Sequence, residues 1–129
     1  MDTETAVRRW IDAWRSAWPA EDVERIASAY ADGPLYSSHP FRDPETARSY
    51  VERAFGEEKL VSCWFGEPVV DRERAAVEYW AVLRSPRGDE VTIAGCAFLR
   101  FGEDGRVVEH RDYWDQTNGA REPSSRWGR

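Results

Sequence analysis

The chain has 129 residues, of which 41% are hydrophobic and 33% charged, and its formal net charge is -6. This length suits one domain with one core, and the acidic balance argues against a basic nucleic-acid-binding face. No apolar run reaches the roughly 18 residues that a membrane span needs, and the acidic start (residues 1–4) lacks a signal-peptide pattern. We therefore expect a cytoplasmic protein that binds neither nucleic acid nor membrane.

Three helices are predicted in the first half of the chain from apolar residues at helical spacing and from their flanking signals. We place them between Thr3 and Pro19, between Glu21 and Asp32, and between Asp43 and Gly56. In the third, Asp43 is the expected cap and Pro44 the first helical residue. A short extended piece at residues 35–38 should lead from the second helix to His39-Pro40.

The hydrophobic period changes to two in the second half, which predicts strands. The expected strands are Leu60–Val70, Ala75–Arg84, Glu90–Phe101 and Arg106–Asp115. Helices followed by a meander of strands indicate an α+β fold, in which three helices lie across one face of an antiparallel sheet and leave a hollow. Residues 1–117 form the predicted domain, and the Gly-, Pro- and Ser-containing segment 118–129 is a predicted loose tail.

Aromatic residues are unusually frequent, with seven Trp, five Tyr and five Phe. Most must contribute to the core, because aromatic side chains supply the largest buried areas. A small domain does not obviously need so many, so a cavity lined by aromatic rings is the alternative to a filled core. The cysteines Cys63 and Cys96 sit in apolar runs, which favours small buried hydrophobic residues over a disulfide or redox pair.

Strand parity assigns side chains to the two faces of the sheet. In the last strand, Glu109 and Arg111 should face solvent, so His110 and Asp112 should point towards the helices. A buried carboxylate needs a hydrogen-bond donor or a cavity with water. In the preceding strand, Gly95 and Ala97 share the inner face and would leave space above it, while Arg100 faces outwards.

The next strand inward could add a second acid, because Glu78 and Trp80 share one face, and an inward orientation would bring Glu78 near Asp112. The opposite face of that strand is apolar and would be too large to leave wet, so we predict a homodimer through it. Its residues are Val77, Tyr79, Ala81 and Leu83, with Cys63 and Phe65 as possible additions.

His39 precedes a proline, which favours an extended backbone, and should lie at the rim of the hollow. An imidazole titrates near neutral pH and suits a general base, although a loop histidine bonded to the backbone is the alternative. No HxxxH, HExxH, GxSxG, P-loop or GxGxxG pattern occurs, so we predict no metal and no cofactor. His39 and Asp112 are expected to face the same hollow.

Two stretches carry a family resemblance. Residues 10–40, with the run Tyr30-Ala31-Asp32, resemble the opening of ketosteroid isomerases and SnoaL-like proteins. The stretch Arg111-Asp112-Tyr113-Trp114-Asp115 is similar to the Arg-Asp-Tyr-Phe-Asp ending of limonene epoxide hydrolases. The resemblance covers residues 5–117 and implies the cone-shaped fold of the SnoaL-like and nuclear transport factor 2-like superfamily.

The resemblance transfers activity only in part. His39 stands where the isomerases keep a carboxylate base, whereas Trp10 and Ala97 replace their oxyanion-binding residues, which argues against steroid isomerisation. Asp112 matches an epoxide-hydrolase acid, but Glu78 and Trp80 replace an Arg and an Asp of the water-activating device. SnoaL-like polyketide cyclases, which use a single acid in an apolar cavity, fit better.

We therefore predict a cavity for a small apolar or aromatic molecule, with cofactor-independent isomerase, cyclase or hydrolase-like chemistry. The alternatives are a non-catalytic ligand-binding domain and a dimeric protein-interaction domain. The predicted catalytic residues are His39, Asp112, His110 and Glu78. The predicted ligand-binding residues are Trp10, Trp14, Tyr30, Trp80, Gly95, Ala97 and Trp114.

Overall fold

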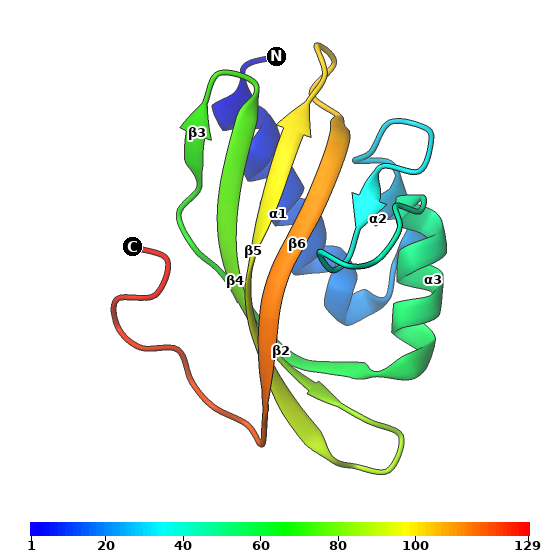
Figure 1. The fold of residues 1–129 in the computed structure, drawn as a ribbon, viewed down its shortest axis with the longest axis vertical. Coiled ribbons are helices and arrows are strands. Elements are labelled where there is room, and N and C mark those ends of the chain that lie inside the picture. The colour runs from blue at the N-terminus through cyan, green and yellow to red at the C-terminus, as the bar shows by residue number, and fades with distance from the viewer.

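The computed structural model describes residues 1–129 and has three helices followed by most of the strands (Figure 1). The helices are α1 (Thr3–Ala20), α2 (Val23–Ala27) and α3 (Ala47–Glu57). The strands are β1 (Tyr36–Ser37), β2 (Lys59–Phe65), β3 (Val69–Asp71), β4 (Arg74–Arg84), β5 (Glu90–Phe101) and β6 (Val107–Asn118). None of the helices is long and apolar enough to cross a membrane.

The strands form one curved sheet in the order β1-β6-β5-β4-β2, with β3 paired to β4, and the helices lie across one face (Figure 1). The predicted α+β class with three helices over a sheet is confirmed. The sheet is mixed rather than antiparallel, because β1 runs parallel to β6 with Tyr36 opposite His110. The predicted strand 60–70 is divided into β2 and β3, which both pair with β4.

The helix boundaries differ from the sequence predictions by a few residues. Asp2 rather than Thr3 caps α1, and its side chain accepts a hydrogen bond from the Thr5 amide. Thr46 rather than Asp43 caps α3. The cause of the second shift is a two-way backbone pairing between Glu45 and Tyr36, which holds the segment before α3 extended against β1. This pairing brings α3 next to the strand that carries Tyr36.

The core lies between α1 and the inner face of the sheet. Fully buried side chains of α1, such as Val7, meet Val77 of β4 and Leu99 of β5 in one cluster. Each large apolar side chain buried in this way contributes about 1.5–3 kcal/mol to stability. The amphipathic pattern of α1 therefore fixes which helix face covers the sheet.

Strand β4 turns Glu78 away from the helices, so the inward orientation considered for Glu78 is wrong. Val77 pairs with Ala97 and Tyr79 with Gly95, so the inner face of β4 carries the apolar set. Both alternating sets of β4 contain apolar residues, but only one of them also contains charges. The set without a charge is buried, so Glu78 and Trp80 lie on the outer face. The homodimer surface predicted on Val77, Tyr79, Ala81 and Leu83 is therefore wrong, because these residues lie on the inner face of the sheet.

The segment after β6 lies against the outer face of the sheet. Trp80 Nε1 donates a hydrogen bond to the Arg121 carbonyl, and Thr92 Oγ1 donates to the Gly119 carbonyl. Trp127 packs edge-on against Trp80 with ring centroids 5.3 Å apart. The segment predicted to form a loose tail thus makes specific contacts with the face on which Trp80 lies.

Gly128 tests this contact. It is buried at φ 74°, and a Cβ added there would lie 2.7 Å from the Gly66 Cα and closer still to the Trp64 ring. We expect Gly128→Ala to lower the melting temperature and to alter tryptophan fluorescence, because the clash displaces the segment. Gly119→Ala is the matched control, since Gly119 has φ 84° but no atom within 4 Å of its added Cβ. Equal destabilisation by the two variants would contradict the packed arrangement and leave only the backbone penalty of about 1 kcal/mol.

Candidate functional site

A pocket of about 230 Å³ lies between the helices and the inner face of the sheet. Nineteen residues line it, and twelve of them are hydrophobic. Its aromatic members come from every layer of the fold: Trp10, Trp14, Trp18, Tyr36, Tyr50, Phe55, Phe65, Tyr79 and Trp114. Nine of the seventeen aromatic residues of the chain thus line this pocket.

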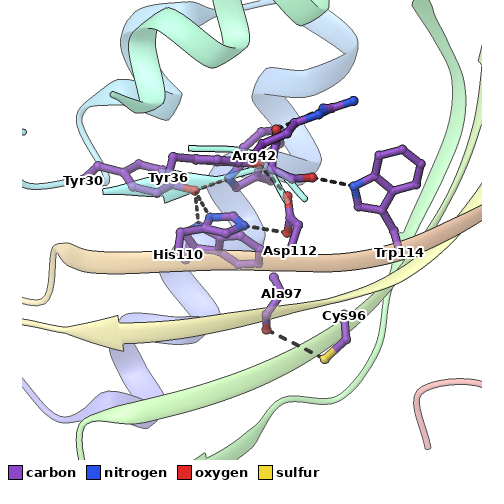
Figure 2. A network of polar contacts seen from close by, with 11 residues as sticks. Tyr30, Tyr36, Arg42, Cys96, Ala97, His110, Asp112 and Trp114 are labelled. Atoms are coloured by element: carbon purple, nitrogen blue, oxygen red, sulfur yellow. Dashed lines mark hydrogen bonds and ion pairs between the residues drawn. The ribbon is translucent and has the colours of Figure 1, made fainter. Parts of the chain in front are cut away.

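The polar centre of the pocket is a His–Asp pair on β6 (Figure 2). His110 and Asp112 are only 1% and 5% exposed. His110 Nε2 lies 2.7 Å from Asp112 Oδ1, and Tyr36 Oη donates to Asp112 Oδ2 at 3.1 Å. His110 is the only basic side chain in contact with Asp112, so no arginine or lysine neutralises this buried carboxylate.

The second nitrogen of His110 continues the network away from Asp112. Nδ1 lies 2.8 Å from Tyr30 Oη. Two indole groups of α1 donate to the same oxygen: Trp10 Nε1 at 2.9 Å and Trp14 Nε1 at 3.2 Å. Tyr30 is 4% exposed and does not line the pocket, so it supports His110 from behind.

Stacked aromatic rings pack against the hydrogen-bonded pair of His110 and Asp112. Tyr36 stacks on His110 with centroids 3.9 Å apart and on Tyr50 with centroids 4.4 Å apart. The parallel pairing of β1 with β6 sets the first contact, and the bridge between Tyr36 and Glu45 sets the position of α3, which carries Tyr50. Backbone pairing thus places three rings in one stack beside Asp112.

Burial shifts the ionisation of the surrounding tyrosines. Desolvation is the largest cause that raises the pKa of Tyr30, Tyr36, Tyr50 and Tyr79 above their ordinary value of 10.0. The negative charge of Asp112 is a further cause for all four. These hydroxyl groups therefore act as neutral donors and acceptors around the carboxylate.

Several residues predicted for the site meet here. His110, Asp112, Trp10, Trp14 and Trp114 line the pocket. Gly95 and Ala97 lie on the inner face of the sheet, opposite Trp114 and Asp112. The room above Gly95 is filled by protein, because an added Cβ would lie 2.8 Å from the Tyr79 ring and 2.7 Å from Trp114 Cβ. Gly95 therefore makes room for those two side chains rather than for a ligand.

Other predicted residues lie elsewhere. His39 is not part of the pocket lining, and its Nδ1 accepts a hydrogen bond from the Phe41 amide, which is the loop arrangement weighed as its alternative. Its ring packs edge-on against Trp114 instead of reaching Asp112. Glu78 and Trp80 are on the outer face, and Trp80 binds the Arg121 carbonyl. The imidazole beside Asp112 is that of His110.

The sequence did not indicate that Tyr36 bonds Asp112 or that Tyr50 and Tyr79 line the pocket. Tyr79 had a usable signal, since it alternates with Glu78 in β4 and the uncharged set is the one to bury. Tyr36 had none, because its contact with Asp112 depends on the pairing of a two-residue strand with the last strand of the sheet.

At the edge of the pocket, Arg42 donates to Ser38 Oγ and lies over the Trp114 ring. Arg53 also lines the pocket, but both of its terminal nitrogens bind Glu45. No group of three or more His, Cys, Asp or Glu side chains is arranged to hold a metal ion.

The family model of the SnoaL-like domain matches residues 7–110, so this chain belongs to the SnoaL-like domain family. The match covers most of α1, all of β1 to β5 and the start of β6 with His110, and it ends before Asp112. A search of curated proteins gave no match.

Solved structures agree on the fold. An epoxide hydrolase of M. tuberculosis described as LEH-like has a TM-score of 0.70 at 22% identity, with 88% of this chain and 84% of that chain covered. The epoxide hydrolase/cyclase-like enzyme SalBIII, of pyran ring formation in the polyether salinomycin, has a TM-score of 0.72 at 15% identity, covering 86% and 91%. An NTF2-like protein of unknown function from Exiguobacterium sp. 255-15 has a TM-score of 0.70 at 14% identity, covering 85% and 98%.

The buried Tyr30 and Tyr36 and the half-buried Tyr50 and Tyr79 predict a loss of stability at alkaline pH. Their folded pKa values lie above the unfolded value near 10.0, so the unfolded chain loses these protons first. The stabilisation is complete below pH 10 and falls above it by about 1.4 kcal/mol per pH unit for each tyrosine. Denaturant unfolding should show almost no loss near pH 9 and a slope that approaches this value between pH 10 and 11, and Tyr50→Phe should make that slope shallower. A flat profile over this range would contradict the assigned burial.

Proposed function

We propose that this protein binds a small, largely apolar or aromatic molecule in the pocket and catalyses proton transfer on it with Asp112, without a cofactor. The observation that carries the proposal is a carboxylate that is 5% exposed, lines an aromatic pocket and lacks a cationic partner. Burying a carboxylate without a permanent counter-charge is costly to stability, so its position in a pocket wall favours a chemical role.

The two hydrogen bonds of Asp112 suit a reversible base. Tyr36 and His110 donate one hydrogen bond to each carboxylate oxygen, which orients the group and stabilises its ionised form. Each oxygen keeps a second lone pair that can accept a proton. Asp112 would take a proton from a carbon next to a carbonyl group, leave the electron pair delocalised onto that carbonyl, and return the proton at another position.

The aromatic lining supports the proposed class of ligand. A pocket of this kind binds by burying apolar surface, while a few polar groups set the orientation. Related folds include proteins described as an epoxide hydrolase and as an epoxide hydrolase/cyclase-like enzyme, which favours isomerisation, ring closure or addition of water over redox chemistry. His39, which lies outside the lining, has no part in this proposal.

Non-catalytic binding is the second candidate, because the same rings and hydrogen bonds would hold a ligand that never reacts. The apolar character of the lining favours binding as such, with twelve hydrophobic residues among nineteen.

The homodimer and the cytoplasmic location stay predictions. For a dimer, the outer sheet face would present Tyr113, which is 47% exposed, rather than the buried set of β4.

Asp112→Asn separates the two candidates. In deuterium oxide, a panel of small cyclic ketones would exchange hydrogen for deuterium and a panel of epoxides would gain water, both detected by mass spectrometry. We expect Asp112→Asn to lower the rate by about 10²–10⁴-fold, the usual contribution of a general base. Binding, followed by quenching of tryptophan fluorescence, should remain.

His39→Gln is the matched control. It removes the only imidazole other than that of His110, and the His39 ring packs against Trp114 and does not contact Asp112. It should retain the wild-type rate. Full activity of Asp112→Asn would contradict Asp112 as the base. Saturable binding with no turnover of either panel would favour the non-catalytic candidate.

A further inference from the structure

The oxygen of Tyr30 has three nitrogen neighbours in a buried site: the indole nitrogens of Trp10 and Trp14 and Nδ1 of His110. Figure 2 shows Tyr30 beside His110. An indole N–H only donates, so both tryptophans donate to this oxygen. A hydroxyl group has two acceptor lone pairs and one proton. Both lone pairs are therefore occupied, and the single Tyr30 proton is left for the third neighbour.

The third neighbour must then be an acceptor. His110 Nδ1, 2.8 Å from Tyr30 Oη, accepts a hydrogen bond from the Tyr30 hydroxyl and carries no proton of its own. The neutral imidazole has one N–H, which is consequently on Nε2 and points at Asp112 Oδ1, 2.7 Å away. The acceptor capacity of one tyrosine hydroxyl thus determines the tautomer of a histidine on a different element.

A doubly protonated His110 does not fit this arrangement. Its Nδ1–H would make a third N–H donor at an oxygen with two lone pairs, and the Tyr30 proton would lose its acceptor. The other titratable groups facing the ring are Tyr36, stacked above it, and Asp112 beside it, while Trp10 packs against its edge at 5.7 Å. None of them offers an alternative acceptor to Nδ1.

We propose that Tyr30, with Trp10 and Trp14, holds His110 as the neutral Nε2–H tautomer, so that Asp112 and not His110 exchanges protons with a ligand. The tautomer follows from the hydrogen bonds alone, whereas its chemical consequence rests on the proposed function. Tyr30 is a positioning residue under this proposal, and the two tryptophans, which also line the pocket, orient it through their N–H groups.

The chain contains only two histidines, which makes the protonation of each nitrogen directly measurable. Protein labelled with ¹⁵N-histidine gives four ring-nitrogen signals in long-range ¹H–¹⁵N spectra, and His39→Gln identifies the pair that belongs to His110. At neutral pH we expect His110 to show a protonated Nε2 and an unprotonated, hydrogen-bonded Nδ1, with no second tautomer. A protonated Nδ1 in the wild-type protein would overturn the proposal.

Trp10→Phe and Trp14→Phe test the role of the indoles. Each removes one donor and frees one lone pair on Tyr30, so that Nδ1–H can donate to it. We expect a protonated Nδ1 to become detectable in each variant, because one hydrogen-bond mismatch is relieved. The readout is the displacement of the Nδ1 and Nε2 signals towards each other.

Trp18→Phe is the matched control. Trp18 comes from the same helix, lines the same pocket and packs edge-on against Trp14, but it does not bond Tyr30. Its spectrum should equal that of the wild type. An equal displacement in Trp18→Phe would indicate general loosening of the cluster, and no displacement in Trp10→Phe and Trp14→Phe would show that the indoles do not set the tautomer. Either result overturns the proposal.

The spectra need no ligand, so failure of this proposal is distinguishable from failure of the proposed function. Wild-type activity of Asp112→Asn, or no turnover at all, would reject the catalytic role and leave the tautomer standing. A protonated Nδ1 together with loss of activity in Asp112→Asn would reject the tautomer and keep the catalytic role.

Discussion

The hydrogen-bonded pair of His110 and Asp112 is the interaction on which the arrangement of this pocket depends, because a carboxyl group at 5% exposure needs hydrogen-bond partners inside the protein. Tyr36 supplies one donor from β1, and His110 supplies the other from β6. The short parallel strand β1 therefore positions one of the two hydrogen-bond partners of Asp112. It brings Tyr36 beside the first half of β6, the last strand of the chain, across a separation of more than seventy residues.

The aromatic residues serve this pair in two distinct ways. One group, including Trp18 and Phe55, presents ring surface to the pocket. Another group contributes polar edges: the indole N–H groups of Trp10 and Trp14 and the hydroxyl of Tyr30 form a relay that reaches His110. Tryptophan and tyrosine are suited to both uses because each combines a large apolar body with one hydrogen-bonding group.

The family fold constrains the chemistry less than the side chains do. SnoaL-like domains and the related solved structures share the sheet and helices, whereas at 14–22% identity the likeness to those structures concerns the fold alone. In this chain the carboxylate of Asp112 contacts a histidine and a tyrosine, and it contacts no arginine or lysine. A single base with neutral hydrogen-bonding partners suits proton transfer within an apolar ligand better than stabilisation of a large negative charge.

The sequence alone determined the α+β class, the order of helices before strands, and the inward direction of His110 and Asp112, because period-two patterning is unambiguous where charged residues such as Glu109 and Arg111 mark the other face. In β4 both alternating sets contain apolar residues, and the prediction misplaced Tyr79 and Glu78 although the set without a charge is the one that is buried. The spacing of two along β6 also put His110 on the same face as Asp112, although His39 was expected to share the hollow with them. Only the tertiary structure placed His39 outside the pocket lining and made Tyr36 and Tyr30 the partners of Asp112 and His110, since strand pairing and ring stacking over long sequence separations leave no record in local spacing.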